Sequence, residues 1–402
     1  MRDCIKKIVP ISLRTKIRKY LYVMNRVRKG RKVFGTKFES KEIKSKGKHV
    51  FFGYYDITPF GKDGNVLFHE IDEKNDVASI GLYNIENNEK KYLANTKAWN
   101  WQQGSRLRWH PTKSDVVVFN DFNGIHYISR EISINDNKEL VHPFPIYDVS
   151  PNGKLAITLD FTRLGYMRPG YGYTILPFNK NDISLDDGID IFDLCQDSLL
   201  KTVSYRDLSL KLGLDQSEYV NWYLNHLSFS PNGDKFLLFF IREISGSFFA
   251  SLLVYNIKEE SITVLEKDLK VSHYDWINND IIICTACNNT RCWYNIYNCI
   301  TKEKEIYCED ILSSDGHPTY LGDGRIITDT YPDKDMYQYI YLVDKKDHSQ
   351  KTIAEVFQTL YDKIEKRTDL HPRVAEDKKH ISFDCNFAGY REMVILNLNS
   401  AL

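Results

Sequence analysis

Four histidines recur at the same place in a repeated sequence pattern. His226, His273, His317 and His371 are spaced roughly 45 residues apart, and a turn follows each of them after six or seven residues. Imidazoles titrate near neutral pH and bind divalent metals through their ring nitrogens. If the four converge, they would suit a metal ion, a general base, or both. The alternative for each histidine is structural, as a hydrogen-bonding residue that ties one repeat to the next.

The repeated pattern is a strand, a tight turn and a second strand. It is clearest over residues 316–329, where Asp323-Gly324 separates two apolar runs. Weaker copies without the histidine begin near residues 58, 107 and 147. Seven such units at this spacing are typical of four-stranded propeller blades. We therefore predict an all-β fold, a seven-bladed β-propeller. Because first strands start at the central funnel, the four histidines should ring one side of one funnel mouth.

The segment 161–173 supplies further candidates for the same face. It carries Arg163, Arg168, Tyr171 and Tyr173 among glycines. Glycines let a backbone approach a ligand closely, arginines clamp carboxylates, and tyrosines stack on sugar rings or transfer protons. Other polar residues of expected funnel loops are Gln103, Asp329 and Tyr331. For the aromatic residues, ordinary packing between blades is the alternative.

Several of these motifs resemble a known family. Segments 168–173, 315–320, 328–333 and 367–373 are similar to those of bacterial propellers related to oligogalacturonate lyase and, more distantly, to TolB-type propellers. The likeness covers about residues 49–397. It implies β-elimination on uronic-acid oligosaccharides, with a histidine base, an arginine near the substrate and a Mn-type ion. By blade order it implies that His226 is the base and His273 the first metal ligand.

Together these features predict a polysaccharide lyase that cleaves a uronic-acid-containing glycan with the help of a divalent metal, Mn²⁺ being the ion that the resemblance implies. The predicted catalytic residues are His226, Arg163 and Tyr173. The predicted substrate-binding residues are Arg168, Tyr171, Gln103, Asp329 and Tyr331. The predicted metal ligands are His273, His317 and His371. The alternative from another class is a non-catalytic propeller that binds carbohydrate or protein in polysaccharide assembly.

Charge is unevenly distributed along the chain, although the net charge is zero. Residues 1–32 hold 12 Lys and Arg against one acid, while the remainder holds 42 basic and 53 acidic residues. Ser12 is a plausible helix N-cap, and apolar residues recur after it at helical spacing between the basic ones. We predict a basic helical arm with its linker over 1–45, and the propeller over 46–402. Residues 1–32 should contact the inner face of an anionic membrane. The alternative is that they pack on the propeller or on a partner.

Other features narrow the class. No apolar run reaches about 18 residues, so no transmembrane helix is expected, and no signal peptide is recognised. The eight cysteines lack paired metal spacing, which predicts reduced thiols in a cytoplasmic protein. Walker, GxSxG and HExxH motifs are missing, and the acidic body argues against nucleic-acid binding. The last unit shows only three strands, so a fourth is expected from elsewhere, with residues 36–43 as a candidate outer strand.

Overall fold

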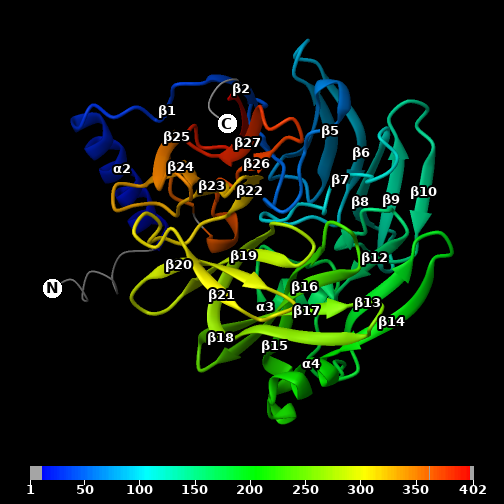
Figure 1. Cartoon of the computed structure of the whole chain (residues 1–402). Helices are drawn as coiled ribbons and strands as arrows, with labels where there is room; N and C mark the ends of the chain where they lie inside the picture. Colours follow the sequence, from blue (N-terminus) through cyan, green and yellow to red (C-terminus); the bar gives the residue numbers. More distant parts are fainter. Residues whose placement is uncertain (1–10, 362, 399–402) are drawn as a thin grey trace.

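The computed structural model describes residues 11–361 and 363–398, and antiparallel sheets dominate it (Figure 1). In Figure 1 the sheets follow one another around the molecule in the order of the sequence, and the last sheet lies beside the first. No helix in the described part of the chain is long and apolar enough to cross a membrane.

The first three sheets each contain four strands that are neighbours in sequence order. The first consists of β3 (His49–Phe51), β4 (Asn65–Ile71), β5 (Ala78–Asn84) and β6 (Lys90–Thr96). The second consists of β7 (Arg108–Trp109), β8 (Val116–Phe122), β9 (Tyr127–Ser133) and β10 (Glu139–His142). The third consists of β11 (Asp148–Val149), β12 (Leu155–Thr158), β13 (Gly188–Asp193) and β14 (Ser198–Ser204). Each is a simple meander of the kind expected of a blade.

The next sheet has seven strands, where the sequence predicted two separate units. Its strands are β15 (Trp222–Phe229), β16 (Lys235–Ile244), β17 (Ser247–Asn256), β18 (Ser261–Trp276), β19 (Ile281–Cys287), β20 (Cys292–Asn298) and β21 (Lys304–Tyr307). β18 is continuous over 16 residues. Lys270 within it pairs with Ala250 of β17 and also with Cys287 of β19. The two units are therefore joined because one strand belongs to both.

The N-terminal segment completes the last two sheets. These contain β22 (Thr319–Gly322), β23 (Arg325–Asp329), β24 (Tyr337–Asp344) and β25 (Ser349–Phe357), then β26 (Arg373–Val374), β27 (His380–Cys385) and β28 (Glu392–Asn397). Strand β2 (Glu39–Ile43) pairs with β28 as the fourth strand of the last sheet. Strand β1 (Phe34–Thr36), which the sequence did not predict separately, pairs with β25 as a fifth strand.

A buried ion pair also joins the last sheet to the first. Arg373 donates to both carboxylate oxygens of Asp384, over 3.0 and 3.1 Å, and to the carbonyl oxygen of Gly53, over 2.9 Å. Asp384 in turn accepts from the backbone N–H groups of Phe52 and Gly53, over 3.2 and 3.3 Å. Both charged side chains are almost fully buried. We call these four residues the latch.

Turn residues explain where the strands reverse. Asp323 and Gly324 both have positive φ (53° and 78°) between β22 and β23, as a two-residue type I′ hairpin requires. This confirms the tight Asp-Gly turn predicted from the sequence. Gly153 and Gly233, at the end of two Ser-Pro-Asn-Gly segments, likewise adopt positive φ. A side chain at these positions would be strained.

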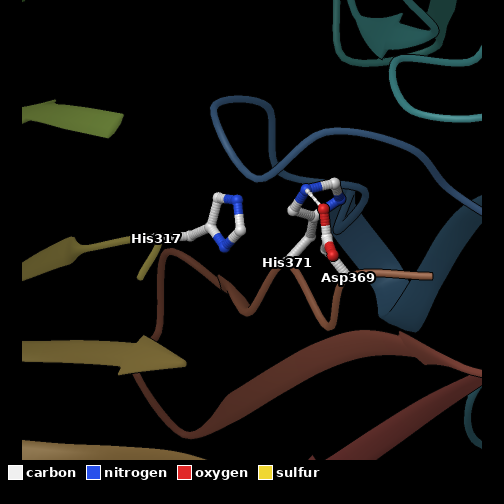
Figure 2. A group of neighbouring side chains, drawn as sticks. All are labelled: His317, Asp369 and His371. Carbon is white, nitrogen blue, oxygen red and sulfur yellow. Dashed lines mark ion pairs between the residues drawn. The ribbon is translucent and has the colours of Figure 1, made fainter. Parts of the chain in front are cut away.

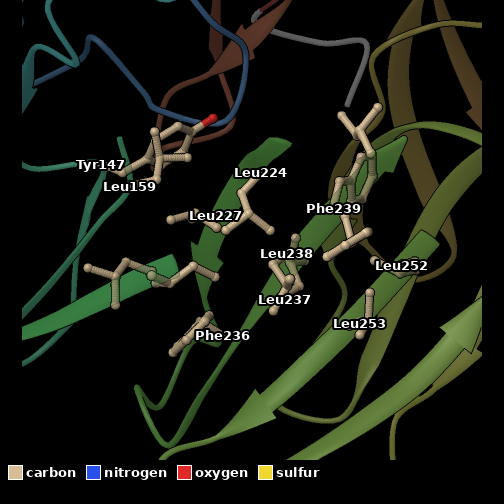
Figure 3. Packing of buried hydrophobic residues seen from close by; sticks show 14 of the residues in the cluster. Tyr147, Leu159, Leu224, Leu227, Phe236, Leu237, Leu238, Phe239, Leu252 and Leu253 are labelled. Carbon is tan, nitrogen blue, oxygen red and sulfur yellow. The ribbon is translucent and has the colours of Figure 1, made fainter. Parts of the chain in front are cut away.

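The largest core cluster lies around β15, β16 and β17 (Figure 3). β16 is buried over seven consecutive residues, Lys235 to Ile241, rather than on alternate ones. A strand that is covered on both faces reads as a continuous apolar run, which is why this segment shows no alternation. The labelled core residues of Figure 3 are Tyr147, Leu159, Leu224, Leu227, Phe236, Leu237, Leu238, Phe239, Leu252 and Leu253.

Helices occur at the N-terminus and in the third unit. They are α2 (Ile11–Arg28), α3 (Phe161–Met167) and α4 (Tyr205–Leu212), with short 3₁₀ turns η1 (Lys62–Gly64), η2 (Gln216–Asn221) and η3 (Ile364–Lys366). Asp160 caps α3 by accepting from the backbone of Thr162 and Arg163, so part of the segment expected as a loop is a helix. α4 begins with a Ser204/Asp207 capping box. The predicted arm helix corresponds to α2.

The cysteine prediction was wrong for one pair. Cys287 and Cys292 form a disulfide, with their Cα atoms 4.0 Å apart. They lie opposite each other at the ends of β19 and β20, and the hairpin brings the two side chains together. The other described cysteines are free thiols, four buried and Cys195 exposed. Cys4 lies outside the described residues. The spacing of the two cysteines did not reveal the disulfide, because they are brought opposite each other only by the register of the β19–β20 hairpin.

Candidate functional site

The structure brings the four recurrent histidines together. Along the series His226, His273, His317 and His371, neighbouring ring centroids are 6.4, 3.8 and 4.4 Å apart. All four side chains are buried. His226 lies at a bulge in β15 and His371 just before β26, both with positive φ, which is uncommon for residues other than glycine. Backbone strain of this kind is often found where side chains are held for function.

Two of the histidines, with one carboxylate, form a candidate metal site (Figure 2). One ligand atom from each of His317, Asp369 and His371 lies within 4.8 Å of the others. His371 Nδ1 is 2.9 Å from the carbonyl oxygen of Gly53, which can only accept, so Nδ1 carries the proton and Nε2 a lone pair. His317 Nδ1 is 2.7 Å from the Asp329 carboxylate, which orients it in the same way. Both Nε2 atoms are buried, and no described residue forms a hydrogen bond with either of them.

This donor set fits a divalent metal ion. Metal-binding histidines usually hold one ring nitrogen on a carboxylate or carbonyl and present the other to the ion, as these two do. Asp369 adds a negative oxygen ligand, and its Oδ2 is 4.0 Å from His371 Nε2. Imidazole and carboxylate ligands suit Zn²⁺, Mn²⁺ and related ions. Asp369 was missed in the sequence, although it stands two residues before His371 in a motif that was singled out.

His273, a predicted metal ligand, lies outside this three-residue group. Its Nδ1 is 3.1 Å from Asp315 Oδ1, and its Nε2 is 3.3 Å from the Ser272 hydroxyl. The ring is in contact with that of His317. His273 therefore neighbours the candidate metal site and has its own carboxylate partner.

Electrostatics keep most of these imidazoles neutral. Burial lowers the pKa of His226 and His371 well below the usual value, and neighbouring histidines lower it further. Burial also lowers the pKa of His273. His317 differs: burial lowers its pKa, but the Asp329, Asp369 and Asp315 carboxylates together outweigh burial, and the net pKa is raised. Neutral imidazoles can accept protons or bind metals near pH 7.

Tyr54 lies at the centre of the histidines and was not predicted as a site residue. Its ring centroid is 4.8 Å from that of His371 and 5.2 Å from that of His226. Its hydroxyl is 3.5 Å from His226 Nε2. The segment that follows β3 carries it there, and Gly53 in this segment has φ +130° and lies against the backbone of Gln103. The sequence signal was the Gly-Tyr-Tyr run at the end of an innermost strand.

A cavity of about 430 Å³ opens beside the histidines. Its wall includes both His226 and His273, together with the aromatic residues Tyr171, Tyr223 and Tyr331. Arg168 also lines it, with its guanidinium over the Tyr171 and Phe248 rings and no hydrogen-bond or ion-pair partner among the described residues. The volume of this cavity is typical of a binding site for a small molecule.

The predicted metal ligands His317 and His371 do not line this cavity, and three other predicted residues lie away from its wall within the protein. Arg163 is buried and donates to the carbonyl oxygens of Trp222 and Tyr219, over 2.8 and 2.6 Å. Tyr173 is buried against Phe161, and its hydroxyl accepts from Asn120 over 2.9 Å. Gln103 donates to the Tyr147 hydroxyl and to Asn225 Oδ1. These contacts are those of residues that support the fold around the site.

Asp329 acts behind the histidines instead of lining the cavity. Its Oδ1 accepts from both the backbone N–H and Nδ1 of His317, and its Oδ2 accepts from the backbone N–H of His371 over 3.0 Å. One buried carboxylate therefore orients the His317 imidazole and also holds the backbone at His371, whose imidazole is oriented by the Gly53 carbonyl.

Known structures share this architecture. No family model matches the chain, and no curated protein matches it by sequence. An oligogalacturonate lyase from Vibrio parahaemolyticus is similar over 92% of this chain and 97% of its own, with a TM-score of 0.64 and 13% identity. An oligogalacturonate lyase in complex with manganese is similar over 91% and 95%, with a TM-score of 0.66 and 13% identity.

The β-propeller domain of the Trilobed protease from Pyrococcus furiosus is similar over 87% of this chain and 96% of its own, with a TM-score of 0.52 and 12% identity. The fold is thus mainly β-sheet with propellers as its structural neighbours. The predicted resemblance to oligogalacturonate lyases is confirmed at the level of the fold.

Proposed function

We propose that this protein is a polysaccharide lyase that cleaves a uronic-acid-containing glycan by metal-assisted β-elimination, in bacterial surface polysaccharide metabolism. One observation carries the proposal. Two buried imidazole nitrogens and the Asp369 carboxylate lie next to a cavity lined by His226 and Arg168. Within the described part of the chain, these nitrogens have no hydrogen-bond partner and Arg168 has no ion-pair partner. The likeness to oligogalacturonate lyases supports the same assignment.

The elimination breaks the C5–H and C4–O4 bonds of a uronate and forms a C4=C5 double bond conjugated with the carboxylate. His226 takes the C5 proton, since its imidazole is neutral near pH 7 and lines the cavity. Arg168 pairs with the uronate carboxylate and stabilises the negative charge that develops there. A divalent ion held by His317, Asp369 and His371 would supply further positive charge, which makes the C5 proton more acidic.

The leaving oxygen on C4 needs a proton. We assign this step to Tyr171, because it lines the cavity and its ring lies 6.4 Å from that of His226. Tyr173 was the first choice from the sequence, but its hydroxyl is engaged with Asn120 inside the protein. Arg163 likewise donates to backbone carbonyls inside the protein. We therefore assign the binding of the substrate's uronate carboxylate to Arg168 and not to Arg163.

The test is to incubate the protein with Mn²⁺ and a panel of uronic-acid glycans, and to follow the ultraviolet absorbance of the unsaturated product. We expect EDTA to suppress the signal and His226→Ala to abolish it. Arg168→Gln and Tyr171→Phe should lower kcat/KM by at least about tenfold. Their matched controls, Arg163→Gln and Tyr173→Phe, should act through stability instead. Saturable glycan binding without product, unaffected by EDTA and by His226→Ala, would favour a non-catalytic binding platform.

We further propose that the sheets form seven blades in a closed ring over residues 46–402, with the seven-stranded sheet counting as two blades that share β18. The latch and the pairing of β2 with β28 support closure between the last and first blades. Residues 1–45 are then the arm and its linker, although β1 and β2 within them pair with propeller strands. Of these two ranges, residues 1–10, 362 and 399–402 lie outside the described part of the chain.

We also propose that the arm holds a cytoplasmic protein on the inner face of an anionic membrane. Apolar side chains of α2 support this, since they remain about half exposed among basic residues: Leu13, Ile17, Leu21, Met24 and Val27. Such a helix lies in the interface with its apolar side chains toward the lipid. Contacts of its C-terminal end with the body, including Asn25 to Asp335 over 3.0 Å, leave that stripe uncovered.

A further inference from the structure

A second cavity, of about 310 Å³, lies between α2 and the loops of the first and last sheets. We call it the arm cavity. Lys16 and Lys19 of α2 line one side, and no described residue forms an ion pair with either of them. Trp101, Lys366 and Arg391 line the other side. This cavity is separate from the histidine site, since the two share no lining residue.

Arg391 is the most unusual residue of the arm cavity. Its side chain is only 4% exposed, yet no described carboxylate pairs with it. The guanidinium donates to the carbonyl oxygens of Trp101 and Arg367 and lies over the Trp101 ring, 5.0 Å from its centroid. Its Nε is buried and has no hydrogen-bond partner among residues 11–361 and 363–398. A buried cation without a counter-ion is unfavourable because it has lost its hydration, so an anion beside it would be bound favourably.

The other charges of the cavity reinforce this preference. Among its described lining residues, Lys16, Lys19, Lys366 and Arg391 are cationic and Glu73 alone is acidic. Glu73 is already engaged, since its Oε1 lies 2.9 Å from Lys366 Nζ and 3.0 Å from His49 Nε2. The balance among these residues favours a ligand with more than one negative charge.

We propose that the arm cavity binds a phosphomonoester, a dianionic group carried on a small organic body. The excess of cations matches two negative charges better than the single charge of a uronate carboxylate. The volume exceeds that of a phosphate alone, and the Trp101 ring supplies an apolar wall for a sugar or glycerol. Because Lys16 and Lys19 come from α2, an occupied cavity would also hold the arm on the body.

Two sources could present the same group: a soluble sugar phosphate and the headgroup of a phosphomonoester lipid. The experiment uses the full-length protein, with inorganic phosphate and glucose 1-phosphate measured by calorimetry. Vesicles of phosphatidylcholine with and without phosphatidic acid are measured by sedimentation. The test variant is Lys16→Gln/Lys19→Gln, on an exposed helix where folding is not at risk. The control is Arg18→Gln/Arg28→Gln, which removes the same charge from α2 outside the cavity.

We expect saturable binding of glucose 1-phosphate or of phosphatidic acid vesicles, at least about tenfold weaker in the test variant. The control should change binding of glucose 1-phosphate less than about twofold, and should weaken vesicle binding clearly less than the test variant does. Binding of the soluble ligand would identify a sugar phosphate as the source, and binding of vesicles alone a lipid headgroup. EDTA should leave binding unchanged, which separates this result from the lyase proposal. The proposal would be overturned if neither glucose 1-phosphate nor the vesicles bind saturably, or if both variants weaken binding equally.

Discussion

Replacing Arg373 with methionine should destabilise the protein strongly, because it removes one of the two charges of the latch. The variant leaves Asp384 buried without its counter-ion, and Gly53 without one donor. Breaking a buried ion pair from one side costs about 3–5 kcal/mol. With an unfolding entropy of about 2.1 cal/mol/K per residue, a chain of about 400 residues should lose about 4–6 °C in Tm.

The latch also predicts strong coupling between its two charges. Arg373→Met combined with Asp384→Asn should regain about half of the loss, since the amide carries no charge and keeps one acceptor for the backbone of Phe52 or Gly53. Scanning calorimetry measures Arg373→Met, Asp384→Asn and the double variant. The surface control is Arg325→Met, because Arg325 lies 3.9 Å from an exposed carboxylate and should contribute less than about 1 kcal/mol. The reasoning is refuted if Arg373→Met melts within about 1 °C of the wild type, or if the two latch substitutions are simply additive.

Three other predictions concern the metal site, acid stability and the arm. Asp329→Asn should weaken Mn²⁺ binding about 10–100-fold in calorimetry, because Asp329 orients the His317 imidazole and holds the backbone at His371; unchanged affinity in a folded variant would contradict the assigned ligands. Burial alone would raise the pKa of Glu131, but hydrogen bonds from His142 and Lys113 lower it to about 2. Its contribution to stability is therefore complete above pH 4.5 and is lost as the pH falls toward 2, so Glu131→Gln should flatten the acid branch of a Tm–pH curve. Deleting residues 1–32 should release the protein from anionic liposomes at low salt, and failure of the full-length protein to sediment with them would assign the arm another role.

Local patterns in the sequence predicted the repeating units well. The Asp323-Gly324 turn follows from residue chemistry, since both residues tolerate positive φ. The need for an outer strand in the last unit followed from counting strands, and β2 supplies it. The joined β18 could not be predicted, because continuity between units depends on long-range register and not on local propensity.

Side-chain direction limited the prediction of the site. Arg163 and Arg168 belong to one segment, but helix α3 turns the first into the protein and leaves the second beside the cavity. Tyr171 and Tyr173 likewise divide between cavity wall and interior. Asp369 and Tyr54 depend on contacts between segments far apart in sequence, such as His371 with Gly53. Residue types therefore led to the proposed chemistry, whereas tertiary packing decides which of the candidate side chains reach the site.

The pairing of β2 with β28 has a consequence for how the chain folds during synthesis. About 350 residues separate Ile43 from Glu392, so the partner of β2 leaves the ribosome about 20–70 s later at 5–20 residues per second. Until then β2 has unpaired backbone groups, and the last sheet can form only after translation is almost complete. Contacts of such long range slow folding. Lys41 lies in β2 and Lys44 directly follows it. Charged side chains, especially lysines, are common on exposed edge strands, where they oppose aggregation through the unpaired edge.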